Sequence, residues 1–319
     1  MTSSTTAFDA TTQWCGSVNT RQLLIEVDDE LVVEQYWQGA DATSTQDCAS
    51  IQKSATAVVL GQLVAEGIVD LGAPAADYLG SGWTRLEGEA EQAITVRHLI
   101  TMSTGLDEYF DFDAPPGTHW YYNNNAYHRV RRLLELATGL DSNTLFSQRL
   151  FGPLQMTNSS FVPRPGSEDA DGWPQSGLHT CARDLWRFGR AVLDRADLGC
   201  TDAFLDEMCS PSTTMNPSYG YLWWRLGGSS AVMPGNPPGR PVDPRHSFGR
   251  IEIDRPIAPE APADTVAGFG MGDQRLYLVA SANAVVVRLG LPHTEDPSGG
   301  SFDREFWSRC RPEIESYLP

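Results

Sequence analysis

The sequence predicts an α+β fold, in which helices flank an antiparallel sheet built from both ends of the chain and a mostly helical lobe lies between those ends. Runs of alternating or continuous apolar residues near both termini indicate strands, whereas the middle of the chain shows helical spacing. Strands and helices do not alternate, which argues against a parallel βαβ arrangement. We expect one unit over residues 1–319, with an α/β lobe from about 1–60 and 230–319 and a helical lobe from about 61–229.

Two hairpins are predicted, one near each end of the chain. Residues 22–38 form two β-rich runs around Asp28 and Asp29, which is a typical hairpin signal. Residues 274–280 and 284–290 alternate or run apolar, and a short Ser-Ala-Asn turn joins them. Because strands are predicted at both ends of the chain and helices between them, we expect the two hairpins to share one sheet.

A helix is predicted from about residue 50 to 66, where residues at helical spacing form one mostly apolar face and Gly67 stands at the end. The residues of that face are Ile51, Ala55, Val58, Val59, Gln62 and Leu63. Further helices are predicted over 95–103, 124–138, 141–150, 182–195 and 302–317. Residues 235–263 are rich in Pro and Arg and lack periodicity, so they are predicted to form a long loop.

The charged composition excludes several classes of function. The chain has 22 Arg and a single lysine, Lys53, against 24 Asp and 17 Glu, which gives a net charge of −18. Without basic runs, such a chain is not expected to bind nucleic acid or an anionic membrane, because both need Lys or Arg to meet phosphates. The acidity fits a saline habitat, and a codon bias towards Arg would give the same composition.

Export, membrane and cofactor signals are not visible in the sequence. No apolar run reaches the ~18 residues of a membrane span, and the first residues lack the basic and apolar segments of a signal peptide. We therefore expect a cytoplasmic protein, or a periplasmic or secreted one if the N-terminus is truncated. The cysteines form no Cys-x-x-Cys pair and are expected to be mostly free and buried. The histidines show no ligand spacing, so we expect neither a metal nor another cofactor.

The single lysine lies in a Ser-x-x-Lys motif at the start of the apolar helix, Ser50 to Lys53. Residues three apart on a helix lie about 5–6 Å apart on one face, so the hydroxyl and the amine can meet. Serine is a weak nucleophile that needs a base, and lysine acts as one when burial and a helix N-terminus lower the pKa of its amine. The helix end also offers the Ser50 amide as half of an oxyanion hole.

Chance is the competing explanation for this motif, because serine is a common residue. Against chance, Lys53 is the single lysine of the chain, and it stands in this motif at the start of an apolar helix. Arginine cannot replace a lysine that acts as a base, because the guanidinium stays charged in proteins. We therefore interpret Ser50 as a nucleophile and Lys53 as its base.

A second motif follows a Pro-Gly turn at residues 116–117 and leads into the helix predicted over 124–138. Tyr122 and Asn124 fit a Tyr-x-Asn pattern, in which a phenol moves protons and an amide holds a lysine or a substrate carbonyl. The alternative is an aromatic loop with Asn residues that cap the next helix.

Together these segments resemble the serine β-lactamase-related hydrolases, a family that includes class C β-lactamases, penicillin-binding proteins, esterases and 6-aminohexanoate-oligomer hydrolases. The resemblance covers most of the chain and is strongest to the esterase and oligomer-hydrolase branch. The matching segments, in order, are 50–54, 95–106, 116–124, 181–189, 219–224, 272–279 and 285–290. It implies the serine β-lactamase/transpeptidase-like fold, with Ser50, Lys53 and Tyr122 as catalytic residues and Asn124 in a supporting role.

The resemblance also implies an oxyanion hole and one missing charge. By resemblance the amides of Ser50 and Met271 hold the oxyanion, or that of Phe269 if the register slips by two residues. The β-lactamase and peptidase branches carry Lys-Thr-Gly on this strand, whereas residues 267–271 here are Ala-Gly-Phe-Gly-Met. A lysine there helps anchor a substrate carboxylate, so its loss should weaken recognition of β-lactams and peptides by ~1.5–3 kcal/mol. An ordinary tight hairpin entry is the alternative for this Gly-rich stretch.

Weaker signals surround these motifs. Trp223, Trp224 and Gly270 are candidate substrate-binding residues, although the tryptophans are as easily explained by packing at a lobe interface. Acidic residues in the loop over 107–113 could attract an ammonium group, although a solvated loop is the better interpretation. Ser103 is the rival nucleophile, but it lacks the first glycine of a Gly-x-Ser-x-Gly elbow and does not follow a strand.

We expect a serine hydrolase that acts through an acyl-enzyme on small carboxylic esters or linear amides. A β-lactamase or D-Ala-D-Ala carboxypeptidase-like activity is the alternative, because the same residues serve those reactions in the family. A non-catalytic ligand-binding relative is an alternative of another class. The retained Ser50, Lys53 and Tyr122 argue against it, since a retired site has no reason to keep the single lysine.

Overall fold

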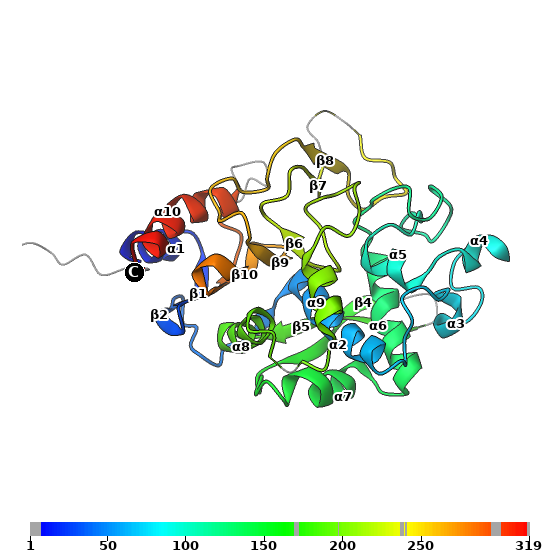
Figure 1. Ribbon diagram of the computed structural model, residues 1–319, viewed down its shortest axis with the longest axis horizontal. Coiled ribbons are helices and arrows are strands. Elements are labelled where there is room, and N and C mark those ends of the chain that lie inside the picture. The colour runs from blue at the N-terminus through cyan, green and yellow to red at the C-terminus, as the bar shows by residue number, and fades with distance from the viewer. Residues whose placement is uncertain are drawn as a thin grey trace, which may run out of the picture. The chain divides into compact units, whose positions relative to one another are not determined.

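The computed structural model describes residues 8–168, 172–196, 198–236, 239, 241–294 and 301–317 (Figure 1). The chain divides into two compact units, each built from separate segments. Unit 1 comprises Met1–Gln52, Leu150–Asp197 and Ile257–Pro319, and unit 2 comprises Lys53–Arg149 and Leu198–Pro256. The two lobes expected from the sequence have boundaries that differ from those of these units, and that division stays a prediction.

Unit 1 contains an antiparallel sheet that confirms both predicted hairpins. Its strands run in the order β2, β1, β11, β10, β9, so segments from the two ends of the chain lie side by side. Their bounds are β1 Thr20–Val27, β2 Glu30–Tyr36, β9 Val266–Gly270, β10 Gln274–Val279 and β11 Ala284–Gly290. Strands β10 and β11 are buried along their whole length, as expected for strands covered on both faces.

Three helices pack around this sheet. Helix α8 (Ala182–Leu193) contacts β1, β10 and β11, and its Gly189 permits the approach because an added Cβ would lie 2.8 Å from Leu276. Helices α1 (Asp9–Ser17) and α10 (Phe302–Tyr317) lie against each other (Figure 1). The sequence predicted α8 and α10 but not the short α1. The 3-10 turn η3 (Ala280–Ala282) joins β10 to β11.

A second small sheet in unit 1 includes two strands from the middle of the chain, where the sequence predicted mostly helices. Its order is β3 (Gln46–Asp47), β5 (Pro174–Thr180), β4 (Ser160–Glu168). Two prolines and a glycine interrupt β4, and the register of its pairing shifts between Pro163 and Glu168. These residues hid the strand, because proline and glycine are depleted in regular strands.

Unit 2 is built around helix α2 (Gln52–Ala65), which directly follows the 3-10 turn η1 (Ala49–Ile51). Every residue from Ile51 to Leu63 is buried, so the helix is enclosed on all sides rather than on one face as predicted. The neighbouring helices are α3 Ala76–Leu79, α4 Glu89–Gln92, α5 Val96–Ile100, α6 Asn124–Thr138, α7 Ser142–Phe146 and α9 Asp202–Cys209, and the π-helix η2 covers Ser147–Phe151. Helix α6 matches its predicted bounds, and α5, α7 and α8 are shorter than predicted.

The predicted loop over 235–263 contains a strand, and here the prediction was wrong. Strand β8 (Arg250–Ile253) pairs antiparallel with β7 (Ala231–Pro234) within unit 2, and β6 (Trp224–Arg225) precedes them. The four residues of β8 do alternate, but the surrounding prolines masked so short a pattern.

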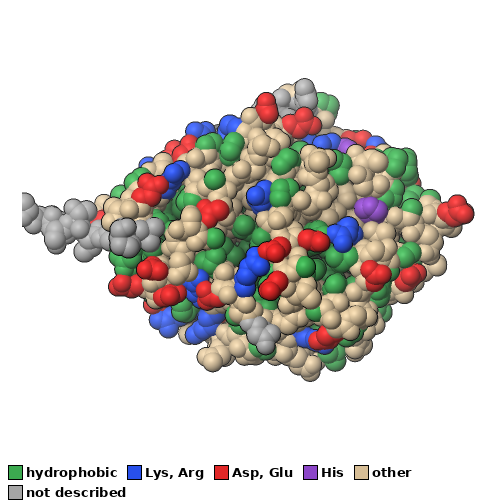
Figure 2. Space-filling model, viewed as in Figure 1, with side chains coloured by type: hydrophobic (Ala, Val, Ile, Leu, Met, Phe, Trp, Pro, Cys, Tyr) green, Lys and Arg blue, Asp and Glu red, His purple; other side chains and the backbone are tan. Residues whose placement is uncertain are grey.

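Most of the cysteines are free and buried, as the sequence predicted. Cys15, Cys48, Cys181 and Cys310 are free and buried, and Cys200 and Cys209 are partly exposed. On the face shown in Figure 2, acidic and basic side chains are interspersed. Among the described residues, no helix combines the length and the apolar character that crossing a membrane requires.

Candidate active site

The structure brings the predicted residues of unit 2 together around the single lysine. Lys53, the second residue of α2, is 2% exposed, and its Nζ donates a hydrogen bond to Asn124 Oδ1 at 2.9 Å. The same Nζ lies over the ring of Tyr122, 4.8 Å from the centroid, and over the ring of Tyr127, at 4.4 Å. Tyr122 and Asn124 therefore both contact Lys53, and the catalytic roles of all three stay predictions. The sequence did not single out Tyr127.

Tyr122 is held in a cluster of aromatic rings. It is 6% exposed and stacks on Trp224, with centroids 5.9 Å apart and an interplanar angle of 22°. Trp120 and Tyr219 complete the cluster, with centroids 6.3 Å from that of Tyr122. Trp224 therefore supports Tyr122, and Trp223, which is fully buried, packs in the interior.

Local sequence explains how the segment before α6 presents Tyr122. Gly117 adopts φ of +79°, a left-handed conformation that favours glycine, and its amide donates to Ser103 O at 2.8 Å. Asn123 caps α6 by accepting a hydrogen bond from Ala126 N at 2.9 Å. Its amide group also donates to Leu106 O at 3.1 Å. The chain is thus fixed on both sides of Tyr122.

Ser50 lies in unit 1, within the turn η1 that runs directly into α2. The residue before it, Ala49, has φ of +51°, which is strained for a residue with a Cβ. Asp47 stabilises this turn, because its Oδ1 accepts from Ala49 N at 2.8 Å. Arg164 in turn holds Asp47 through two nitrogens, with Nε–Oδ2 at 3.0 Å and Nη2–Oδ2 at 2.8 Å. The sequence motif did not reveal this support.

Strand β9 ends against the same turn, also within unit 1. A Cβ added to Gly270 would lie 2.3 Å from the carbonyl oxygen of Cys48, so only glycine allows this approach. Met271, the predicted second oxyanion donor, follows directly, and its side chain is 81% exposed. Phe269, the alternative, is 9% exposed, and its ring lies under the guanidinium of Arg275 at 4.4 Å.

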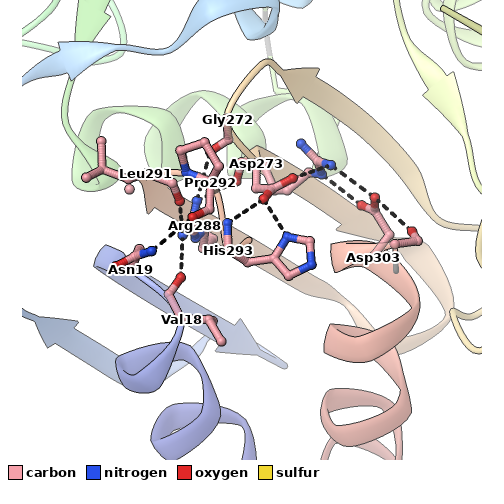
Figure 3. Close-up of polar contacts among 12 residues, drawn as sticks. Val18, Asn19, Gly272, Asp273, Arg288, Leu291, Pro292, His293 and Asp303 are labelled. Carbon is pink, nitrogen blue, oxygen red and sulfur yellow. Dashed lines mark hydrogen bonds and ion pairs between the residues drawn. The ribbon is translucent and has the colours of Figure 1, made fainter. Parts of the chain in front are cut away.

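A buried arginine holds the turn between β9 and β10, as Figure 3 shows. Arg288 donates to the carbonyl oxygens of Gly272 (3.1 Å), Asp273 (3.0 Å) and Leu291 (2.7 Å), and to that of Val18 (3.1 Å). Burial lowers the pKa of Arg288 to about 10, although nearby Asp273 opposes that shift. The guanidinium thus ties together the turn after Met271, the end of β11 and the end of α1.

Two carboxylates complete this charged network (Figure 3). Asp303 binds Arg275, with Nε–Oδ1 at 2.8 Å, and accepts from the Tyr277 hydroxyl at 2.7 Å. Asp273 Oδ2 lies 2.8 Å from His293 Nδ1. Burial disfavours the charge of Asp273, but Arg275 and the hydrogen bonds from His293 outweigh it and hold the pKa of that carboxyl below its ordinary value.

The acidic loop over 107–113 makes internal bonds in unit 2. Asp107 accepts from the amides of Tyr109 (2.8 Å) and Asp111 (2.9 Å), and Glu108 accepts from the Tyr121 hydroxyl at 2.8 Å. Asp107 is 1% exposed and Glu108 is 7% exposed. These two carboxylates are therefore neither part of a surface patch that could attract an ammonium group nor part of a solvated loop. They shape the loop instead.

The rival nucleophile Ser103 lies in a different environment. It follows helix α5 rather than a strand, and its side chain is 2% exposed. Its hydroxyl shares a hydrogen bond of 2.8 Å with the hydroxyl of Thr101. Neither feature is typical of a nucleophile elbow, in which a sharp turn exposes the hydroxyl.

Comparison with known proteins now identifies the class of this protein. The sequence profile of the Beta-lactamase family matches residues 17–249, more than half of the chain. The chain belongs to the Beta-lactamase family, which confirms the resemblance inferred from the motifs. The family fold is that of serine hydrolases that act through an acyl-enzyme.

Solved structures show the same fold over nearly the whole chain. A Mycobacterium bovis β-lactamase has a TM-score of 0.67 at 16% identity, covering 97% of this chain and 100% of that one. A Bacillus anthracis protein described as a 6-aminohexanoate-dimer hydrolase has a TM-score of 0.69 at 17% identity, covering 97% and 82%. A D-alanine carboxypeptidase from Burkholderia cenocepacia has a TM-score of 0.65 at 19% identity, covering 98% of each. The predicted β-lactamase/transpeptidase-like fold is therefore confirmed.

Proposed function

We propose that this protein hydrolyses small carboxylic esters or linear amides, with Ser50 as nucleophile and Lys53 as its base. The observation that carries the proposal is the environment of Lys53. The single lysine of the chain is buried beside Tyr122 and bonded to Asn124. A buried amine loses favourable hydration of its charge, which is the condition that a lysine base needs.

The reaction proceeds in two halves. Ser50 Oγ attacks the substrate carbonyl carbon as its proton moves to Lys53, and the amides of Ser50 and Met271 hold the oxyanion. Tyr122 relays that proton to the leaving alcohol or amine as the bond to the carbonyl carbon breaks. Water then attacks the acyl-enzyme and loses a proton through the same groups, and Ser50 Oγ regains one as the carboxylic acid leaves.

The absence of a lysine at 267–271 supports esters and linear amides over β-lactams. Strand β9 presents Ala, Gly and Phe where the β-lactamase branch has Lys-Thr-Gly. The neighbouring strand β10 carries one cation, Arg275, and Asp303 already binds it at 2.8 Å. Arg275 is thus committed to a buried ion pair and is a poor replacement for a carboxylate anchor.

Turnover of p-nitrophenyl acetate tests this function. We expect wild type and Ser103→Ala to release p-nitrophenol at similar rates, and Ser50→Ala to fall to the background rate. Wild-type activity no higher than that of Ser50→Ala would contradict the proposal and favour a non-catalytic binding protein.

Nitrocefin, assayed in parallel, tests the substrate preference. We expect its kcat/KM to be well below that of the ester, because the carboxylate anchor is missing. Fast nitrocefin turnover would show that another group binds the carboxylate and would favour the β-lactamase or carboxypeptidase alternative.

A further inference from the structure

Tyr127 lies beside the single lysine, although no sequence motif pointed to it. The residue is fully buried in α6, three positions after Asn124. Its ring centroid is 4.4 Å from Lys53 Nζ, closer than the 4.8 Å of Tyr122. Its hydroxyl shares a hydrogen bond of 3.0 Å with the Thr56 hydroxyl.

These contacts form two matched links between α2 and α6. Lys53 and Thr56 are three residues apart on α2, and Asn124 and Tyr127 are three residues apart on α6, so each pair lies on one helix face. Lys53 bonds to Asn124 at 2.9 Å, and Thr56 bonds to Tyr127 at 3.0 Å. The second link fixes the tilt of the Tyr127 ring beneath the amine.

The Tyr127 ring adds an attraction for the protonated Lys53 amine to the hydrogen bond that the Asn124 oxygen accepts. When Lys53 takes a proton it becomes an ammonium ion at a position only 2% exposed, where water cannot solvate it fully. The negative charge of a ring face attracts such a cation. A carboxylate would attract it far more strongly and would keep the lysine protonated in the resting enzyme, whereas a neutral ring stabilises the ion without locking it.

We propose that Tyr127 is a positioning residue that holds the Lys53 amine in place and stabilises its protonated form through the face of its ring, with Thr56 fixing the ring. The catalytic consequence rests on the proposed function. The interaction between ring and amine does not, and it can be measured without any substrate.

The composition of the chain makes that measurement direct. Because Lys53 is the single lysine, protein grown with lysine labelled with carbon-13 at the ε position and carrying a lysine-free tag gives one lysine side-chain NMR signal. A pH titration of that signal reports the ionisation of Lys53 alone. Tyr122 and Tyr219 are further titratable groups close to these residues, and burial raises the pKa of Tyr219 well above its ordinary value.

Two variants of Tyr127 separate the ring from the hydroxyl. We expect Tyr127→Leu to move the titration midpoint of the Lys53 signal to lower pH by about one pH unit, because the protonated form loses the ring face. We expect Tyr127→Phe to keep the wild-type midpoint more closely, because the ring remains. Thr56→Val should fall between these variants, because it frees the ring to tilt.

Phe204→Leu is the matched control. It removes a buried ring that packs against the same helix as Tyr127 does, because Phe204 of α9 lies against Gly61, eight residues beyond Lys53 on α2. We expect it to leave the midpoint unchanged. An equal midpoint in wild type and Tyr127→Leu, or an equal shift in Phe204→Leu, would overturn the proposal.

If Tyr127→Leu does not fold, an isosteric replacement can still test whether the ring face stabilises the protonated Lys53 amine. A trifluorinated phenylalanine at position 127 has nearly the shape of phenylalanine but little negative charge on its ring face. We expect it to lower the midpoint relative to Tyr127→Phe. No difference between these two proteins would contradict the proposal.

The activity readout shows which proposal fails, if one does. We expect Tyr127→Leu to lower kcat for p-nitrophenyl acetate by about tenfold with little change in KM, and to shift the acidic limb of the pH profile to lower pH. An inactive wild type with the expected NMR shifts would overturn the hydrolase and leave the role of Tyr127 intact. Normal hydrolysis by wild type together with an equal NMR midpoint in wild type and Tyr127→Leu would overturn the role of Tyr127 and leave the hydrolase proposal intact.

Discussion

The surroundings of Lys53 in unit 2 and the turn between β9 and β10 in unit 1 are held by opposite kinds of interaction. Around Lys53 the structure places an amide oxygen and the faces of two tyrosine rings, all of them neutral groups. Around the turn it places two buried arginines with carboxylate or carbonyl partners.

The difference matches what each region has to do in the proposed reaction. A backbone turn that offers amide donors needs a fixed geometry, and a buried, fully bonded charge network provides one. A proton acceptor needs to change its charge during each turnover, and neutral neighbours permit that change. We therefore expect substitutions at Lys53 and its contacts to affect mainly catalysis, and substitutions in the charged network around the β9–β10 turn to affect mainly stability.

Replacing the base is expected to give the largest effect. Lys53→Arg keeps a positive charge but cannot accept the Ser50 proton, so kcat/KM for p-nitrophenyl acetate should fall by about 10²–10⁴-fold. Arg304→Lys is the control, because it makes the converse change in an exposed ion pair with Glu260. Retention of more than a tenth of wild-type activity in Lys53→Arg would remove Lys53 as the base.

Removing a carboxylate from the network should destabilise the fold. Asp303→Ala removes the closer carboxylate of the buried Arg275, which keeps only its longer contact of 3.3 Å with the carboxylate of Asp273, and is expected to lower the free energy of unfolding by about 3–5 kcal/mol in urea titrations. Glu305→Ala, which removes a partly exposed pair with Arg309, should cost less than about 1 kcal/mol. Similar losses in both variants would show that the network does not hold the turn.

A single methyl group tests the close approach of β9 to the Ser50 turn. Gly270→Ala places a Cβ where the Cys48 carbonyl now lies, so we expect a loss of about 1–3 kcal/mol of stability and a fall in kcat as the turn moves. Gly72→Ala serves as the comparison, because its nearest atom would be an Asp70 oxygen at 3.4 Å. An unchanged kcat in a folded Gly270→Ala would show that the close approach of β9 to this turn does not affect the reaction.

Acid titration should give the smallest effect and should involve the turn rather than Lys53. The pKa of Asp273 is held below its ordinary value, so its stabilising contribution is present above about pH 4 and is lost as the pH falls through the lower folded-state pKa. Asp273→Asn should therefore flatten the acid end of the plot of unfolding free energy against pH. An acid limb as steep as that of wild type would assign the effect to other carboxyls.

The sequence predicted elements whose signals are local and missed those that depend on distant partners. Both terminal hairpins and helix α6 followed from alternation and helical spacing. Strand β4 was missed because its prolines and glycine contradict the local preference, and pairing with β5 stabilises it nevertheless. Tertiary pairing of this kind leaves little trace in a single sequence.

The same limit applies to the site. Ser50, Lys53, Tyr122 and Asn124 could be predicted as candidates because their motifs have fixed spacing. The charged network was not found, because Arg275 and Asp303 are distant in sequence and nothing in the sequence pairs them. One signal was present in the sequence: each of two largely apolar strands contains an arginine, at positions 275 and 288. A buried arginine requires hydrogen-bond acceptors, so these residues indicated that polar partners lie nearby.

The most direct test of the central claim is to locate the acyl-enzyme. Wild type and Ser50→Ala are treated with a fluorophosphonate, digested, and the modified peptide is sequenced by mass spectrometry. The account predicts one adduct on Ser50 in wild type and none in Ser50→Ala. An adduct on Ser103 or another serine, or equal labelling of the two proteins, would contradict it.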